Sequence, residues 1–389
     1  MTPIPTAIAP HAAATSSLPE PPADFASSPK PYLVMLHISG VGDPYYVELM
    51  TRDGLAGPMV AAKSRSEKLY YFPPSSCSPG PMCVGAETAA YNLPEVSISK
   101  THVYFLDGES LIRSLAMDGT VKTVMDVGAP PNTQVVFAVS PDDKRIAIAT
   151  ITLATSNVAD SFHDVISVED VGTAANRVDI YSSTTQAEWP LSWHEGELVV
   201  GVGPADIGAY DTPYGAIAYH VVDPATGRRI SSLDCAQGLL SPTGVACVSG
   251  FCTTASTCRD GSVGKEGYDG SKTTFAVPTA PAPRILTAFA HTAQLSPDGT
   301  RLAATVVSAD PNRGSDDTVI IGDGTLTTVS HLGAPLGWID DSRIVVAGGF
   351  NAYVVDTADP SSVLAMFSQA PRPAGGFPTL AGVLPTNLL

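Results

Sequence analysis

The sequence predicts an all-β fold, a β-propeller of seven four-stranded antiparallel blades, with six or eight blades as the alternatives. Three observations predict it. Short runs rich in Val, Ile, Leu, Tyr and Thr are interrupted every 8 to 12 residues or so by Gly, Pro or Asp-Gly. No stretch has a sustained 3.6-residue apolar period, so helix should be scarce. A turn motif also recurs at a nearly constant spacing.

The two best copies of this motif are SPDDKRIAI, from Ser140, and SPDGTRLAA, from Ser296, which begin 156 residues apart. Weaker copies lie near positions 103, 198, 245 and 344, so successive copies are about 48 residues apart, the size of one blade. Pro presets φ, Asp bonds to its own turn and Gly accepts a positive φ. The segment near Leu69 is interpreted as a further copy, and residues 31–38 as another copy or as the strand that closes the ring.

A second hairpin follows several copies, with an Asp-Gly or Thr-Gly corner in LAMDGTVKTV, VVDPATGRRI and IIGDGTLTTV. Two hairpins make one blade. A single blade cannot cover its own apolar face, so neighbouring blades must stack until the ring closes, which also leaves few exposed edges.

The copies SPDGTRLAA and SPDDKRIAI, together with VVDPATG, resemble the repeats of bacterial TolB-type and WD-repeat-like propellers. The resemblance extends over residues 32–370. It implies a propeller with a binding funnel. It does not imply a ligand, because such repeats serve binding, assembly and catalysis alike.

Residues 1–30 are rich in Pro, Ala, Ser and Thr and have no periodicity, so we expect a disordered tail or tether there and a single propeller domain over 31–389. The start of the chain has no basic region followed by an apolar one, so no signal peptide is expected in this sequence. No apolar run approaches the roughly 20 residues that span a bilayer.

The net charge is −17 and only 15% of residues are charged. Such a surface repels a phosphate backbone and an anionic membrane alike, which excludes nucleic acid as a partner. We expect a monomer that binds a protein or a carbohydrate.

Six cysteines lie in segments rich in Ser, Thr, Gly and Pro, which indicates disulfide-closed loops and an extracellular, periplasmic or cell-surface location. Of the 15 connectivities that six cysteines allow, we favour the sequential one: Cys77 with Cys83, Cys235 with Cys247, and Cys252 with Cys258. The rival is a zinc site formed by the last four cysteines, but structural zinc pairs usually have closer spacing.

No nucleophile elbow, HExxH, phosphate-binding loop or dinucleotide-binding motif is present, so no catalytic residue is assigned. The eight histidines are scattered and receive no role. Trp189, Trp193 and Trp338 stand at blade entries, where packing is favoured over a stacking platform for a sugar.

An insertion between Leu153 and Arg177 carries clustered acidic residues and is predicted to be a long loop. Its carboxylates could hold Ca²⁺, the one cofactor considered, but the pattern of a known calcium loop is missing, so a solvated acidic loop is favoured. The candidate ligands are Asp160, Asp164, Glu169 and Asp170. Residues 309–317 and 247–270 are predicted to form two further loops.

Together these features favour an extracellular or surface-tethered binding or scaffold protein that recognises a protein or carbohydrate through loops on one face. The alternative is a propeller enzyme, lactonase-like or lyase-like, in which carboxylates from different blades hold a metal in the central funnel. Such ligands would be far apart in sequence and would form no motif.

Overall fold

The computed structural model describes residues 25–38, 44–66, 68–70, 87–89, 95–130, 132–152, 162–204, 216–235, 238–249, 262–276, 293–306, 317–331, 333–348, 351–359, 363–367 and 377–386. Within these ranges the regular secondary structure is β-strand, and the single helical element is the short 3₁₀ turn η1 (Phe25–Ser27). No helix in the described ranges has the length and apolar character needed to cross a membrane.

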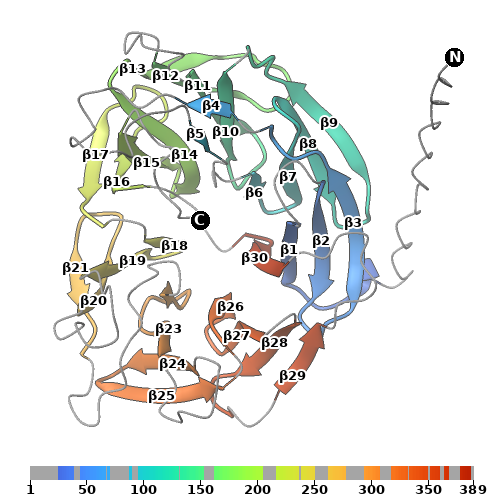
Figure 1. Ribbon diagram of the computed structural model, residues 1–389, viewed down its shortest axis with the longest axis vertical. Coiled ribbons are helices and arrows are strands. Elements are labelled where there is room, and N and C mark those ends of the chain that lie inside the picture. The colour runs from blue at the N-terminus through green and yellow to red at the C-terminus, as the bar shows by residue number, and fades with distance from the viewer. Residues whose placement is uncertain are drawn as a thin grey trace, which may run out of the picture.

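Seven four-stranded antiparallel sheets form a ring (Figure 1), which confirms the predicted fold class and blade number. From the innermost strand outward, the first four blades are β30 (Phe377–Leu384), β1 (Tyr32–Ile38), β2 (Tyr45–Thr51) and β3 (Ala56–Ala62); β6 (Val96–Ile98), β7 (His102–Asp107), β8 (Leu111–Ala116) and β9 (Val121–Asp126); β10 (Thr133–Val139), β11 (Arg145–Thr152), β12 (His163–Asp170) and β13 (Val178–Ser183); and β14 (Gln186–His194), β15 (Glu197–Pro204), β16 (Ala218–Val222) and β17 (Arg229–Leu233).

The remaining three blades follow the same order along the chain. They are β18 (Leu239–Ser241), β19 (Gly244–Ser249), β20 (Ser262–Glu266) and β21 (Lys272–Thr274); β22 (Gln294–Leu295), β23 (Leu302–Val306), β24 (Asp317–Gly322) and β25 (Thr325–Ser330); and β26 (Pro335–Asp340), β27 (Arg343–Gly348), β28 (Asn351–Asp356) and β29 (Val363–Phe367). The three hairpins with Asp-Gly or Thr-Gly corners are therefore the outer pairs of blades 2, 4 and 6.

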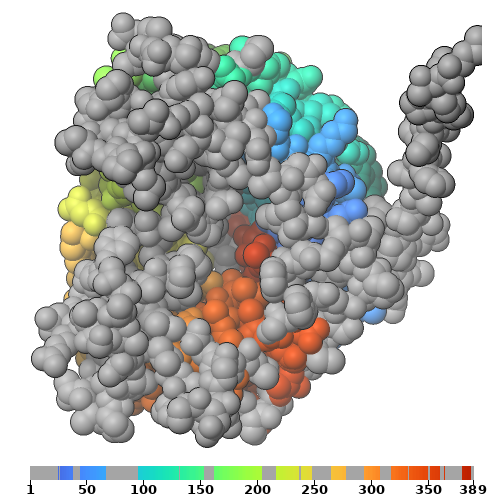
Figure 2. Space-filling view, viewed as in Figure 1, coloured from blue at the N-terminus to red at the C-terminus, as the bar shows by residue number. Residues whose placement is uncertain are grey.

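The ring closes by pairing the last strand of the chain with the first. Strand β30 is the innermost strand of blade 1 and runs antiparallel to β1, with Tyr32 opposite Leu384. In the space-filling view the red atoms of β30 lie between the blue atoms of the first strands and the orange atoms of blade 7 (Figure 2). Residues 31–38 form the second strand of blade 1, the position that the repeat copies take in the other blades, and they pair with the closing strand β30. Each of the two interpretations of this segment is therefore met in part.

The segment near Leu69 is not a blade. Strand β4 (Lys68–Tyr70) pairs only with β5 (Glu87–Ala89), in a two-stranded sheet that lies within the crossover from blade 1 to blade 2. The prediction of a further repeat copy there is wrong. Its apolar run is as short as that of many blade strands, so composition alone could not distinguish the two.

The antiparallel order gives the ring two different faces. Connections from the first to the second strand of a blade, and from the third to the fourth, lie at one face, which we call the turn face; between described strands none exceeds seven residues. Connections from the second to the third strand, and crossovers to the next blade, lie at the opposite face, which we call the loop face. All seven connections of nine or more residues between described blade strands are at the loop face: 63–95, 153–162, 205–217, 250–261, 275–293, 307–316 and 368–376.

The repeated motif forms the same turn in blades 3 and 6. The backbone N–H of Ser140 and of Ser296 donates to the carbonyl oxygen of the Arg five residues later, and the N–H of that Arg donates to the serine hydroxyl. Each serine hydroxyl in turn donates to the Asp two residues on. The fourth position has a positive φ in both copies, +69° at Gly299 and +61° at Asp143. The two sequence copies are therefore structurally equivalent, as predicted.

Apolar side chains between successive blades form the core. The largest cluster spans blades 3, 4 and 5 and contains Trp189 and Trp193, which are 0% and 4% exposed. Trp193 Nε1–H donates to Ala138 O of blade 3, and Trp338 Nε1–H donates to Gln294 O of blade 6, each at 3.0 Å. The indoles thus pack and link neighbouring blades, which favours the packing interpretation over an exposed stacking platform.

Phe25, inside the segment expected to be a tail, is buried at the turn face. Its ring stacks on Tyr32 with centroids 4.9 Å apart and lies where a Cβ on Gly57 would stand, so the glycine is needed for this contact. Residues 1–24 of the expected tail lie outside the described ranges.

Candidate functional site

A cavity of about 180 Å³ lies on the axis of the ring at the turn-face ends of the innermost strands. Every blade contributes to its lining. The apolar part is formed mainly by Val96, Ile98, Val139, Leu191, Trp193, Leu239, Leu240, Leu295, Leu336, Trp338, Leu380 and Val383, with the turn prolines Pro141, Pro242 and Pro297. A site of this size can hold one side chain or a small ligand.

The polar residues of the lining are Ser97, Ser192, Ser241, Gln294 and Thr386. Several are already engaged: Ser97 Oγ accepts from Val139 N–H, and Gln294 Nε2 donates to Pro335 O. The lining contains no carboxylate, imidazole or thiol. The donors that hold Ca²⁺ or Zn²⁺ are therefore missing from it, and the described cavity does not fit a carboxylate-held metal.

The candidate metal ligands fall on a strand and not in a loop. Asp164, Glu169 and Asp170 belong to β12, the third strand of blade 3, so the predicted loop is wrong over 163–170. Five residues of extended strand separate Asp164 from Glu169 by about 16 Å, too far for one shared ion. In the described ranges no group of three metal-ligating side chains occurs. Asp160 lies outside the described residues.

Glu169 and Asp170 end β12 at the turn face. Glu169 is 2% exposed, and burial raises the pKa of its carboxyl although Arg177 lowers it. Asp170 accepts a hydrogen bond from Asn176 Nδ2 at 2.7 Å. Both residues therefore belong to the turn between β12 and β13.

Asp164 is at the other end of β12, at the loop face, and is fully buried. Its Oδ2 accepts the backbone N–H of Glu188, the third residue of β14, at 2.6 Å. Glu188 Oε1 lies 3.1 Å from His220 Nδ1 on β16. Burial raises the pKa of the Asp164 carboxyl well above its ordinary value. The hydrogen bonds from the backbone N–H groups of Glu188 and Val165 act against this rise, and the charge of Glu188 adds to it.

This group was not predicted from the sequence. The signal that could have found it is the alternation in HDVISVED, where Asp164, Ile166 and Val168 point to one side and are buried. The acidic residues obscured that period. The partner residue, Glu188, comes from another blade and shares no sequence pattern with Asp164.

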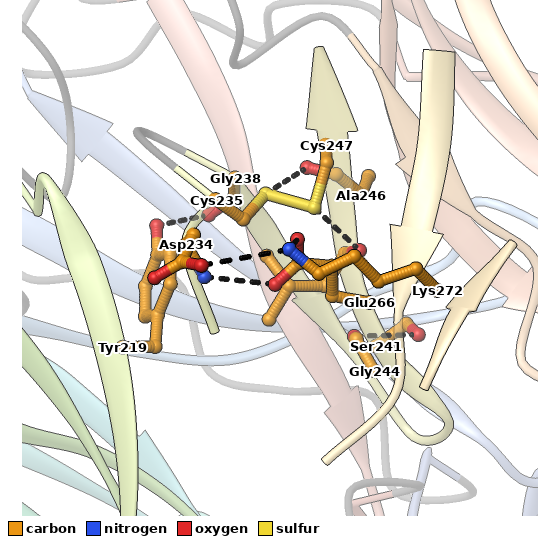
Figure 3. Close-up of a disulfide and its surroundings, with 11 residues drawn as sticks. Tyr219, Asp234, Cys235, Gly238, Ser241, Gly244, Ala246, Cys247, Glu266 and Lys272 are labelled. Atoms are coloured by element: carbon orange, nitrogen blue, oxygen red, sulfur yellow. Dashed lines mark hydrogen bonds and ion pairs between the residues drawn. A yellow bond between two sulfur atoms is a disulfide. The ribbon is translucent and has the colours of Figure 1, made fainter. Parts of the chain in front are cut away.

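One predicted disulfide is confirmed. Cys235, in the crossover from β17 to β18, is bonded to Cys247 on β19, with Cα atoms 5.3 Å apart (Figure 3). Beside it Lys272 Nζ lies 2.7 Å from Glu266 Oε1, and the other oxygen of Glu266 accepts the Asp234 N–H. The bond thus ties a loop-face crossover to its blade. The cysteines of the other two predicted pairs, Cys77, Cys83, Cys252 and Cys258, lie outside the described residues.

Strand topology and cavity together define this protein as a seven-bladed β-propeller that is closed by its last strand and has a small axial cavity of mixed polar and apolar lining. No protein-family model matches the chain, and no curated protein is similar to it in sequence.

Solved propellers resemble it in fold. TolB from Acinetobacter baumannii is 9% identical, with 93% of this chain and 68% of that chain covered and a TM-score of 0.31. The Pan2 WD40 domain from Neurospora crassa is 12% identical, with 86% and 88% covered and a TM-score of 0.37. Acylaminoacyl peptidase from Pyrococcus horikoshii is 11% identical, with 82% and 50% covered and a TM-score of 0.40, so the chain spans half the length of that enzyme. These likenesses concern the fold and carry no argument about function.

Proposed function

We propose that this chain is an extracellular or surface-tethered binding or scaffold protein that engages a protein or carbohydrate ligand through its loop face. The observation that supports the proposal is the distribution of connections: all seven of nine or more residues between described blade strands are at that face. Binding residues concentrate on loops that a rigid scaffold positions. The described axial cavity, in contrast, offers no acid, base or metal ligand.

The direction in which the chain enters the propeller supports the same face. Strand β1 starts at the turn face, and η1 precedes it there, with Phe25 packed beside Gly57. If residues 1–24 serve as the tether, they leave from the turn face. A tether attached there presents the loop face away from the surface that holds it.

The test is binding by the full chain and by loop-face variants. Residues 154–160 and 308–315 are replaced, separately, by short Gly-Ser linkers; β11, β12, β23 and β24 remain intact. Pull-down from a secreted proteome and a glycan array distinguish a protein ligand from a carbohydrate. The expected result is loss of binding at least tenfold in one linker variant. Unchanged binding in both variants, with loss in the turn-face control Lys144→Ala, would contradict the proposal.

The compartment is tested by titrating thiols in denatured, unreduced protein. The Cys235–Cys247 bond supports an oxidising location, because cytosolic thiols are kept reduced. We expect no free thiols if all three predicted pairs form, and no more than four if only this pair does. Six free thiols in protein purified under thiol-blocking conditions would contradict an extracellular or surface location.

A further inference from the structure

The seam between blades 3 and 4 contains a carboxyl group that neither the fold nor the proposed binding role explains. Asp164 is 0% exposed, although it lies only one residue from the loop-face end of β12. Its Oδ2 accepts one hydrogen bond across the seam, from Glu188 N–H. Its Oδ1 is buried and has no hydrogen-bond partner among the described residues. The backbone N–H groups of Glu188 and Val165 favour the charged form, but burial outweighs them. A buried charged carboxylate with one oxygen left without a hydrogen bond is costly away from water.

A charged Asp164 would weaken the contact between blades 3 and 4, because its carboxyl lies between them. Asp164 belongs to the third strand of blade 3 and its acceptor bond ends on the innermost strand of blade 4. Around it lies the largest apolar cluster of the described chain, with Ile151, Ile166 and Ala187 fully or almost fully buried. Little water can reach the carboxyl without separating the two blades.

The charged neighbours of Asp164 do not neutralise it. Glu188 faces it from β14 and is itself beside the imidazole of His220, from β16. Both side chains are nearly buried, at 6% and 8% exposure. The imidazole of this group therefore contacts Glu188 and not Asp164. When a buried acid lacks a cation and faces a second carboxylate, the neutral form is favoured.

The other titratable groups on neighbouring elements interact with groups other than the Asp164 carboxyl. Tyr181 on β13 donates its hydroxyl to Gln186 O at 3.0 Å, and burial raises its pKa to about 12, so it stays neutral. The positive charge of Arg229 on β17 offsets a small part of that rise in the pKa of Tyr181. His163, next to Asp164 on β12, is exposed and lies 3.2 Å from Ser182 Oγ. Opposite Asp164 on β11 is the apolar Ile151.

We propose that the Asp164 carboxyl is a proton-controlled latch that closes the seam between blades 3 and 4 when neutral and weakens it when ionised. The neutral group keeps the acceptor for Glu188 N–H and removes the buried charge. Loss of the proton restores that charge opposite Glu188, at the loop face. The latch depends only on the described contacts and is independent of the proposed ligand binding.

The direction of the pH effect follows from the pKa of Asp164, which burial raises well above its ordinary value. Between the unfolded and the folded pKa, the folded chain holds a proton that the unfolded chain has lost, so stability decreases as pH rises. The contribution is complete below the unfolded pKa, about 3.9. It is lost progressively as pH rises through the folded pKa, and above that pH it stays lost.

The first experiment is thermal unfolding of the full chain from pH 5 to pH 9, for the wild type and for Asp164→Asn. Asparagine keeps an oxygen for Glu188 N–H and cannot ionise. We expect the difference in melting temperature, variant minus wild type, to increase by roughly 2 °C per pH unit until Asp164 is ionised in the folded wild type. Above that pH the difference should stay constant. The matched control is Asp126→Asn, an exposed carboxyl whose pKa is lowered by Ser110, so its difference should not vary over this range. A difference for Asp164→Asn that is equally constant would overturn the latch.

Hydrogen exchange on the wild type tests the latch even if Asp164→Asn does not fold. After correction for the intrinsic rate, protection of β14 (Gln186–His194) should fall about tenfold more than that of β1 (Tyr32–Ile38) when pH is raised from 5 to 8. Because β1 is in blade 1, away from the seam, it reports general opening. Equal changes in the two strands would overturn the proposal.

Discussion

The turn face and the loop face differ in how their connections are built. At the turn face, short connections satisfy their own polar groups: Asp118 accepts the Thr120 N–H, Asp223 the Ala225 N–H, and Asp269 the Ser271 N–H. At the loop face, by contrast, seven of the connections between described blade strands have nine residues or more. We therefore expect the strands and the turn face to determine the fold. The long connections of the loop face should tolerate changes in sequence that leave the fold intact.

The carboxyl groups of three short turns and of the blade seam have different surroundings. Hydrogen bonds within their own turns lower the pKa of the exposed carboxyls of Asp118, Asp223 and Asp269. At the loop face, burial raises the pKa of Asp164 and of Glu95. Ionisation of Asp118, Asp223 and Asp269 thus favours their turns, whereas ionisation of Asp164 opposes the seam, so acid below pH 4 should weaken these turns and alkali the seam.

The largest effect should come from a buried anchor near the turn face. Trp193→Ala removes an indole that is 4% exposed and its hydrogen bond to Ala138 O, so it should lower the free energy of unfolding by about 3–5 kcal/mol. Urea unfolding measures it. Leu55→Ala, at a turn-face position that is 42% exposed, is the control and should change stability by less than about 0.5 kcal/mol. Similar small losses for both would mean that the indole does not hold blades 3 and 4 together.

The disulfide should have the next largest effect, although it anchors a loop-face crossover. Replacing Cys235 and Cys247 together by Ala opens a loop with a sequence separation of 12 and should cost about 2–3 kcal/mol. Thermal unfolding in oxidising buffer measures the loss, and the reduced wild type should lose a similar amount. No loss in either case would show that the crossover is held by its packing alone.

A single turn position should have a smaller effect. Gly299 has φ +69° in the turn between β22 and β23, and Gly299→Ala should destabilise by about 1–2 kcal/mol because a Cβ strains that conformation. The exposed neighbour, in Thr300→Ala, is the control. In blade 3 the equivalent residue is Asp143, which tolerates the same φ and accepts hydrogen bonds from Thr101 and Tyr104 of blade 2. If Gly299→Ala left the free energy of unfolding unchanged, the positive φ at Gly299 would not be needed for the turn of blade 6.

The sequence predicted the architecture well because the turn face repeats. Ser140 and Ser296 carry local signals, and those signals recur with the period of a blade, so the number of blades followed without knowledge of any contact between them. The structure confirms seven blades, and the strand that begins at Tyr32 pairs with the closing strand β30. The segment near Leu69 was wrongly predicted to be a further copy, because an apolar run this short is too short to show a strand or repeat period.

The candidate site was less predictable because it depends on contacts between blades. The axial cavity takes two to five residues from each of the seven blades, and none of those residues is unusual in its own segment. Asp164 was assigned to a solvated loop because its acidic neighbours suggested exposure. Its burial follows from the pairing of β12 with β11 and from the approach of Glu188, and neither is visible in a local pattern.

The smallest effect should come from the loop face itself. Shortening the connection 307–316 from ten residues to about five, with β23 and β24 intact, reduces the loop-closure cost by only about 0.6 kcal/mol, so the variant should be as stable as the wild type or slightly more stable. The matched control is deletion of one residue from the turn Ser140–Lys144, where five hydrogen-bonded positions leave no spare length and the loss should exceed 2 kcal/mol or so. Urea unfolding of both variants compares the two faces directly. If the loop-face variant were the less stable of the two, the loop face would hold the fold together, and the division between a structural face and a variable face would be wrong.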